Sequence, residues 1–466
     1  MRPELSEYPF DWMLWRSLIS ASRLKHGSEK EYQSALRYIP YFKGVVNTIY
    51  NMGSPGQKFL KIIETYVERI VTAKENNRKV AMTTFCFSPA LLHAMDIVPV
   101  SLEPMTVLGS VMWKRGCLDY MDFCTDIGFS ETGCSSQRGS MGAYLARAAS
   151  EIDFIVIDSA GVCDTNSNAF SFAATYLNKP FYGLNYPATL IDDQTKHYHR
   201  DDYRNMITFL ETHTGKKLDI DRLREVLNQH AKQDALIHEI EELQMLVPNP
   251  MPVTYNFLIY AGRFFFSGVS LYTELLEEML EIVKQNAKQG KSGLTGGQEK
   301  LRAFFIYIDH YSLDLKLWTL LDQRGISHLG NILSRGFSAK APYIKYVQNH
   351  GYQIDTSTLD SMIDSITEIN ARMPMVRSIR GPYDLPHMWL EESAALAKLL
   401  KADCCVYNGT PGCRNTWSNV KLIANDLEKH GFPTHIMYGD AFDERVESWE
   451  ITSTRLEEFF TIRGLL

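Results

Sequence analysis

The chain contains 466 residues, of which 45% are hydrophobic and 22% are charged. This length is enough for about three ordinary domains, and the composition is typical of a globular protein, which excludes disordered, collagen-like and small disulfide-rich chains. The 48 basic and 55 acidic residues leave a net charge of −7 without any basic block, and this argues against nucleic acid as a partner.

The amino-terminal segment does not resemble a secretion signal, because Glu4, Glu7 and Asp11 stand where a basic end and an apolar stretch would be needed. The most apolar later window begins at Phe257, is interrupted by Arg263 and is too short to span a bilayer. We therefore expect a cytoplasmic protein without a membrane partner, in which structural disulfides are rare.

A helical region is predicted over residues 1–75, where an apolar stripe with helical spacing follows a turn signal at residues 53–56. Short β-rich runs then alternate with helical stretches. These runs are Val80–Phe85, Ile97–Leu102, Phe154–Ile157 and Phe181–Leu184. Strands that alternate with helices of this length predict parallel strands, and hence a first α/β domain over residues 76–200.

Residues 201–297 are predicted to form a helical segment with amphipathic periodicity, which ends in a polar, glycine-rich stretch at Gln289–Gln298. A second α/β domain is predicted over residues 298–466. Its strands are Ala303–Ile308, Cys404–Tyr407 and Thr434–Tyr438, and its helices lie around residues 313–323, 388–400 and 416–429. The pattern thus predicts two parallel-sheet domains with a helical insert and a helical N-terminal region.

Three of the eight cysteines precede predicted helices in positions suited to ligand binding. Cys163 and Cys413 each follow a strand, and Cys134 precedes a helix that is expected to start near Arg138. Open α/β sheets bind ligands at the carboxyl ends of their strands, where helix N-termini favour anions. These three thiols could converge on an iron–sulfur or other metal site with an open coordination position, or they could be ordinary loop and core residues.

The other five cysteines have weaker patterns. Cys404 and Cys405 lie within an apolar strand, and Cys117 and Cys124 lie within an amphipathic stretch, so packing is the favoured interpretation for these four. Cys86 follows a strand directly, and it could be either a ligand or a neighbour of the site.

Candidates for proton transfer are weak. Glu131, His93 and Asp164 lie close in sequence to the cysteine-bearing loops, but capping or solvation explains each of them equally well. The chain has no complete phosphate-binding loop, no GxGxxG after a strand, and no HExxH or GxSxG motif. A hydrolase or a simple dehydrogenase is therefore disfavoured, and any ATP hydrolysis is expected of another protein.

Four blocks in order resemble the 2-hydroxyacyl-CoA dehydratase and benzoyl-CoA reductase family. They are PALLHAMDIVPVSLEP, GCSSQRGSMG, EIDFIVIDSAGVCDTN and the carboxyl-terminal run from ADCCVYNGTPGCRN through GFPTHIMYGDAFDERVESWEITSTRLEEFF. The resemblance implies two Rossmann-like domains and one 4Fe-4S cluster held by three cysteines. On this chain those cysteines are Cys134, Cys163 and Cys413, with Cys86 as a contested ligand.

The resemblance also implies partners and a reaction. The family works as heterodimers of two related subunits, with an acyl-CoA substrate, and a separate ATP-hydrolysing iron–sulfur activator supplies one electron. In the dehydratases this electron turns the thioester carbonyl of a 2-hydroxyacyl-CoA into a ketyl radical anion, which expels the hydroxyl group. We expect an oxygen-sensitive, dehydratase-like lyase subunit. The alternatives are a benzoyl-CoA reductase-type subunit and an electron-relay or scaffold subunit whose partner binds the substrate.

Overall fold

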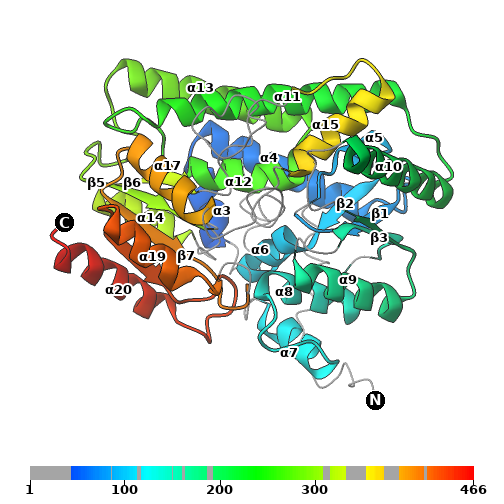
Figure 1. Ribbon diagram of the computed structural model, residues 1–466, viewed down its shortest axis with the longest axis horizontal. Helices are drawn as coiled ribbons and strands as arrows, with labels where there is room; N and C mark the ends of the chain where they lie inside the picture. The colour runs from blue at the N-terminus through cyan, green and yellow to red at the C-terminus, as the bar shows by residue number, and fades with distance from the viewer. Residues whose placement is uncertain are drawn as a thin grey trace. The chain divides into compact units, whose positions relative to one another are not determined.

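Two four-stranded parallel sheets organise the chain, each in its own compact unit (Figure 1). Unit 1 comprises Met1–Tyr186 and Asp201–Leu223, and unit 2 comprises Pro187–Arg200 and Arg224–Leu466. The α/β class predicted from the sequence is confirmed. The computed structural model describes residues 43–85, 87–112, 117–149, 151–159, 163–185, 193–307, 315–331, 353–371, 388–413 and 417–466.

The sheet of unit 1, here called sheet A, has the strand order β2-β1-β3-β4, with every neighbouring pair parallel. Its strands are β1 (Val80–Thr83), β2 (Val98–Ser101), β3 (Phe154–Ser159) and β4 (Phe181–Asn185). All residues of β1 and β2 are buried, as expected of parallel strands covered on both faces. Each of the four strands matches a β-rich run of the sequence to within two residues at either end.

Seven helices are described in the amino-terminal part of unit 1: α3 (Lys43–Tyr50), α4 (Ser54–Val71), α5 (Ala90–Ala94), α6 (Leu102–Met112), α7 (Leu118–Asp126), α8 (Ser135–Leu145) and α9 (Asp164–Leu177). α4 buries the apolar stripe that predicted it, including Phe59 and Ile62. The hydroxyl group of Tyr66 donates a hydrogen bond of 2.8 Å to the carbonyl of Pro99, which anchors this helix to β2.

The predicted helical segment contains α10 (Asp193–Thr214), α11 (Ile220–Leu243), α12 (Tyr255–Phe266) and α13 (Ser270–Lys288). α12 and α13 approach each other closely at Gly262, where an added Cβ atom would lie 2.1 Å from the ring of Tyr272. Glycine is therefore required at this contact. None of the described helices combines the length and the apolar character of a membrane-spanning segment.

The sheet of unit 2, here called sheet B, has the parallel order β6-β5-β7-β8. Its strands are β5 (Leu301–Phe305), β6 (Ile326–Asn331), β7 (Cys404–Asn408) and β8 (Thr434–Met437). The sequence prediction missed β6, because polar residues such as His328 and Asn331 interrupt its apolar pattern. In the structure all six residues of β6 are buried, and the ring of His328 stacks on that of Phe305 with centroids 4.1 Å apart.

The described helices that follow in unit 2 are α14 (Lys316–Arg324), α15 (Leu359–Ala371), the π-helix η2 (Met388–Glu392), α17 (Ser393–Leu399), α19 (Val420–Lys429) and α20 (Trp449–Ile462). α14 packs against β6, α19 against β7 and β8, and α20 against β8. The sequence predicted α14, α17 and α19 but neither α15 nor α20.

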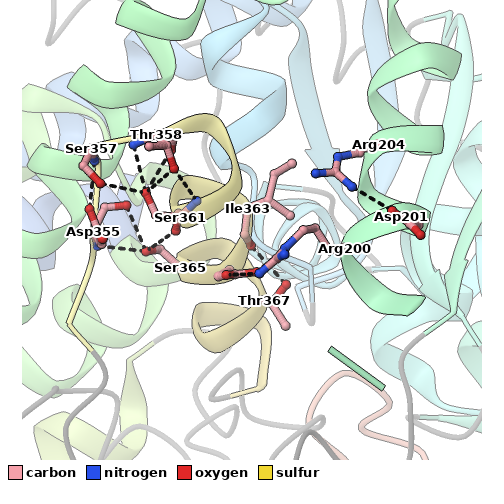
Figure 2. Close-up of polar contacts among 11 residues, drawn as sticks. Arg200, Asp201, Arg204, Asp355, Ser357, Thr358, Ser361, Ile363, Ser365 and Thr367 are labelled. Carbon is pink, nitrogen blue, oxygen red and sulfur yellow. Dashed lines mark hydrogen bonds and ion pairs between the residues drawn. The ribbon is translucent and has the colours of Figure 1, made fainter. Parts of the chain in front are cut away.

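A reciprocal pair of hydrogen bonds starts α15 (Figure 2). The Thr358 side chain accepts from the backbone N–H of Ser361 at 3.1 Å, and the Ser361 side chain accepts from the backbone N–H of Thr358 at 2.9 Å. This arrangement satisfies two N–H groups that the helix itself leaves without an acceptor. Arg200 of α10 donates to Asp364 at 2.9 Å and so holds α15 within unit 2.

Candidate functional site

The carboxyl edge of sheet A carries the N-termini of three helices. α6 and α9 start there because they follow β2 and β3 directly. α8 is held beside α6 by two hydrogen bonds of 2.6 Å, from the Ser140 hydroxyl to the Leu102 carbonyl and from the Thr106 hydroxyl to the Ser136 carbonyl. This is the edge at which parallel α/β sheets bind their ligands.

Cys134 and Cys163 are the N-cap residues of α8 and α9, and both are partly exposed. Their carbonyls accept the first backbone hydrogen bonds of the two helices, each 3.1 Å long, from Arg138 and Ser167. The prediction that the first of these helices starts near Arg138 was wrong by about one turn, since α8 begins at Ser135. A thiolate at a helix N-terminus is stabilised by the helix dipole, so both positions favour the ionised form that binds metal.

Glu103, in the first turn of α6, is a buried carboxyl group at the same edge, with only 2% of its surface exposed. It accepts hydrogen bonds from the Thr84 hydroxyl at 2.8 Å, from the Phe85 backbone N–H at 3.0 Å and from the Gln137 amide at 3.3 Å. Burial raises the pKa of Glu103 to about 7, although the hydrogen bonds from Phe85 and Thr84 oppose this rise. The carboxyl group can therefore gain or lose a proton near neutral pH.

The same network reaches both cysteine-capped helices. Gln137 lies three residues after Cys134 on α8. Asn166 lies three residues after Cys163 on α9, and its amide donates to the Thr84 hydroxyl at 3.1 Å. Glu103 and Thr84 thus connect the first turns of α8 and α9, which places the two cysteines at one edge of unit 1.

The sequence prediction did not include Glu103. A signal was present, because this carboxylate directly follows a buried strand and stands in the first turn of the next helix. That position lies at the carboxyl edge of a parallel sheet, where a charged residue is better placed for function than for packing.

Cys413 lies in unit 2, in the loop that follows β7, with 9% of its surface exposed. Its Sγ atom accepts a hydrogen bond of 3.0 Å from the hydroxyl group of Tyr307, which follows β5. Its backbone N–H donates to the carbonyl of Thr410, and its carbonyl accepts from the N–H of Trp417, both at 2.9 Å. The loop therefore holds Cys413 at the carboxyl edge of sheet B, as its position after a strand predicted.

The other four cysteines that the structure describes are fully buried, which confirms the packing interpretation; they are Cys117, Cys124, Cys404 and Cys405. Burial raises the pKa of Cys117 to about 12 and raises the pKa values of the other three as well. A thiol that stays protonated is a poor metal ligand, so these residues contribute to the core.

The remaining predicted residues are less well placed. Glu131 is exposed between α7 and α8, and His93 is buried in α5. Asp164 is the first residue of α9, and Cys86 lies outside the described residues. Within the described parts of the chain, no three His, Cys, Asp or Glu side chains form a metal-binding group.

Cys134 and Cys163 belong to unit 1 and Cys413 belongs to unit 2. The approach of all three thiols to one cluster therefore stays a prediction.

Comparison with known protein families gives a match over residues 84–462 to the family described as 2-hydroxyglutaryl-CoA dehydratase, D-component. The chain belongs to this family. The matched D-component range includes Glu103 and the three cysteines Cys134, Cys163 and Cys413. The family resemblance predicted from the four sequence blocks is confirmed.

A curated relative is one of the subunits of benzoyl-CoA reductase from Thauera aromatica, which is 23% identical over 273 residues, or 55% of this chain. The match covers 56% of the relative, so the D-component-like chain spans about half the length of the curated protein it matches. The family thus includes dehydratase-like and benzoyl-CoA reductase-like subunits.

Proposed function

We propose that this chain is the iron–sulfur subunit of an enzyme that removes water from a 2-hydroxyacyl-CoA. The observation that carries the proposal is the division of the cysteines into two groups. Cys134, Cys163 and Cys413 stand at the carboxyl edges of parallel sheets, where ligands bind, whereas four others are sealed in the core. The family match over residues 84–462 supports this proposal.

The donor set fits a 4Fe-4S cluster. Cys134, Cys163 and Cys413 would hold it, Cys86 is a contested further ligand, and three protein ligands leave one iron open to a substrate oxygen. When bound, such a cluster supplies an electron and polarises that oxygen. The thiols at the N-termini of α8 and α9 are well suited to an ionised, metal-bound state.

Proton transfer is the part of the reaction that the described residues can perform. Dehydration takes hydroxide from the carbon that bears the hydroxyl group and a proton from the adjacent carbon, so that water leaves. In the proposed reaction, one electron from a separate ATP-hydrolysing activator turns the thioester carbonyl into a ketyl radical anion, and the electron is recovered after both groups have left. Glu103 is the group at the edge of sheet A best suited to exchange the proton, because burial brings its pKa to about 7.

The proposed enzyme is a cytoplasmic, oxygen-sensitive heterodimer of this chain and a related second subunit. A second candidate function is the reduction of an aromatic acyl-CoA, which the match to a benzoyl-CoA reductase favours. A third is electron relay, with the substrate bound by the partner chain. Glu131, His93 and Asp164 stay weaker candidates for proton transfer.

Anaerobic purification tests the cluster assignment by iron and sulfide analysis and electron paramagnetic resonance. We expect iron in the wild type and its loss in Cys134→Ala, Cys163→Ala and Cys413→Ala. Cys405→Ala is the matched control, because it removes a buried core thiol and should retain the iron. Iron-free wild type would overturn the proposal. Retained iron in Cys134→Ala together with its loss in Cys86→Ala would transfer the first ligand to Cys86.

Substrate tests separate the candidate reactions. The activated complex is offered a 2-hydroxyacyl-CoA and benzoyl-CoA in parallel, and water elimination from the first is the expected result. Turnover of benzoyl-CoA alone would replace dehydration by ring reduction. Turnover of neither, with electron transfer to the partner chain intact, would favour the relay function.

A further inference from the structure

The contact between Tyr307 and Cys413 is unusually close for a hydrogen bond to sulfur. The Tyr307 hydroxyl group lies 3.0 Å from the Cys413 Sγ atom, and both side chains are buried. The hydrogen bonds of two core cysteines are longer, at 3.6 Å between Ser110 and the Cys117 sulfur and 3.3 Å between the Cys124 sulfur and the Arg138 carbonyl. The phenol is therefore aimed at this sulfur more directly than ordinary packing requires.

Packing leaves the phenol ring little freedom to turn away. Its ring stacks on that of Tyr407 at an interplanar angle of 26°, and the Ile306 N–H donates to the Val406 carbonyl at 3.0 Å beside it. On another side, a Cβ atom added to Gly409 would lie 3.2 Å from the Tyr307 ring. Glycine at this position allows the backbone of the cysteine-bearing loop to lie against the ring.

A hydroxyl group that donates to a thiolate stabilises its negative charge, and such charge-assisted bonds are stronger than neutral ones. Hydrogen bonds to the sulfur ligands of an iron–sulfur cluster set its reduction potential, together with charge and exposure. The reduced cluster carries one more negative charge than the oxidised cluster. A donor to its sulfur therefore favours reduction and raises the potential.

We propose that Tyr307 is a positioning residue that orients the Cys413 sulfur and raises the reduction potential of the cluster this cysteine would help to hold. This inference rests on the proposed function. No covalent bond changes, because the proton stays on the phenol. The single electron comes from the activator in either case, and the hydrogen bond alters only how readily it is accepted.

Tyr307→Phe tests the inference, because it removes the hydroxyl group and keeps the ring. Tyr407→Phe is the matched control, since it removes a buried phenol from the same stack and leaves the donor to Cys413 in place. The midpoint potential is measured on the anaerobic wild type and both variants by redox titration. Exchangeable protons near the cluster are measured by electron–nuclear double resonance in H₂O and D₂O.

We expect Tyr307→Phe to keep its iron, to lose one exchangeable-proton coupling and to have a lower potential. An about tenfold fall in the ratio of reduced to oxidised cluster at fixed ambient potential corresponds to about 59 mV for one electron. Tyr407→Phe should match the wild type. 3-Fluorotyrosine at position 307 keeps the ring and is a stronger donor, so it should raise the potential.

Unchanged potential and coupling in an iron-loaded Tyr307→Phe protein would overturn the inference. Equal loss of iron in Tyr307→Phe and Tyr407→Phe would also overturn it, because the role would then be packing. Loss of iron in Tyr307→Phe alone would support the orienting role, and the 3-fluorotyrosine protein would decide the effect on potential. Wild type without iron would overturn the proposed function, and the inference with it, before any variant is compared.

Discussion

Replacement of Glu103 by glutamine tests whether this buried carboxyl group carries a proton near neutral pH. The substitution keeps the size and shape of the side chain and removes its ionisation. An amide oxygen can still accept from Thr84, but the amide nitrogen then faces the backbone N–H of Phe85. That mismatch should cost about 1–3 kcal/mol at every pH, because it leaves a buried donor without its acceptor.

The pH-dependent part has the opposite sign. Burial raises the pKa of Glu103 from 4.5, its value in an unfolded chain, to about 7 in the folded protein. A group whose folded pKa is raised stabilises the fold below its unfolded pKa, and this contribution is lost as the pH rises through the folded pKa. The wild type should therefore lose about 3 kcal/mol of folding free energy between about pH 4.5 and just above pH 7. Glutamine does not titrate, so the variant should not share this loss.

Thermal unfolding at pH 5 and pH 8 measures the effect. For a domain of about 200 residues, each kcal/mol shifts Tm by roughly 2–4 °C. We expect the Tm of Glu103→Gln relative to wild type to rise by roughly 6–12 °C from pH 5 to pH 8. Glu131→Gln, at an exposed position, should show no such change. A Tm difference between Glu103→Gln and wild type that is equal at both pH values would refute the reasoning and remove Glu103 as a proton-exchange group.

Two packing predictions follow from the same structure. Gly142→Ala should lower the stability by about 1–3 kcal/mol, because its Cβ atom would lie 2.2 Å from the carbonyl oxygen of Tyr120. Gly296→Ala, whose Cβ atom would meet nothing within 4 Å, is its control in thermal unfolding and should leave Tm unchanged. Arg302→Leu should cost about 3–5 kcal/mol, because it leaves the carboxylate of Glu299, paired at 2.8 Å and 6% exposed, without its cation. The double variant with Glu299→Gln should recover part of that loss, and equal Tm values for the single and double variants would contradict this explanation.

The sequence by itself determined the strands of sheet A and their parallel arrangement. Residues such as Ile155 and Val156 belong to a short apolar run that only a strand covered on both faces would bury, and the intervening helical periods require crossover connections. The same local order placed Cys163 and Cys413 after strands, and hence at a ligand edge. These features depend on neighbours in the chain, so they can be recognised without the fold.

Strand β6 could not be predicted in this way. Its polar residues are typical of a loop, yet His328 is fully buried, because its ring stacks on Phe305 and lies 4.8 Å from the centre of Trp318. These two partners come from β5 and α14. Only the assembled sheet gives a polar side chain such favourable surroundings.

The candidate site shows the same division. Cys134 was recognised from its sequence block, but its position as the cap of α8 depended on where that helix begins. Glu103 was not recognised, because a carboxylate becomes a proton-exchange group only when α6, α8 and the end of β1 enclose it and supply its hydrogen bonds. The sequence by itself determined which chemical groups stand at the strand ends. Tertiary structure decided their burial, partners and pKa, because desolvation and hydrogen bonding come from residues far away in the chain.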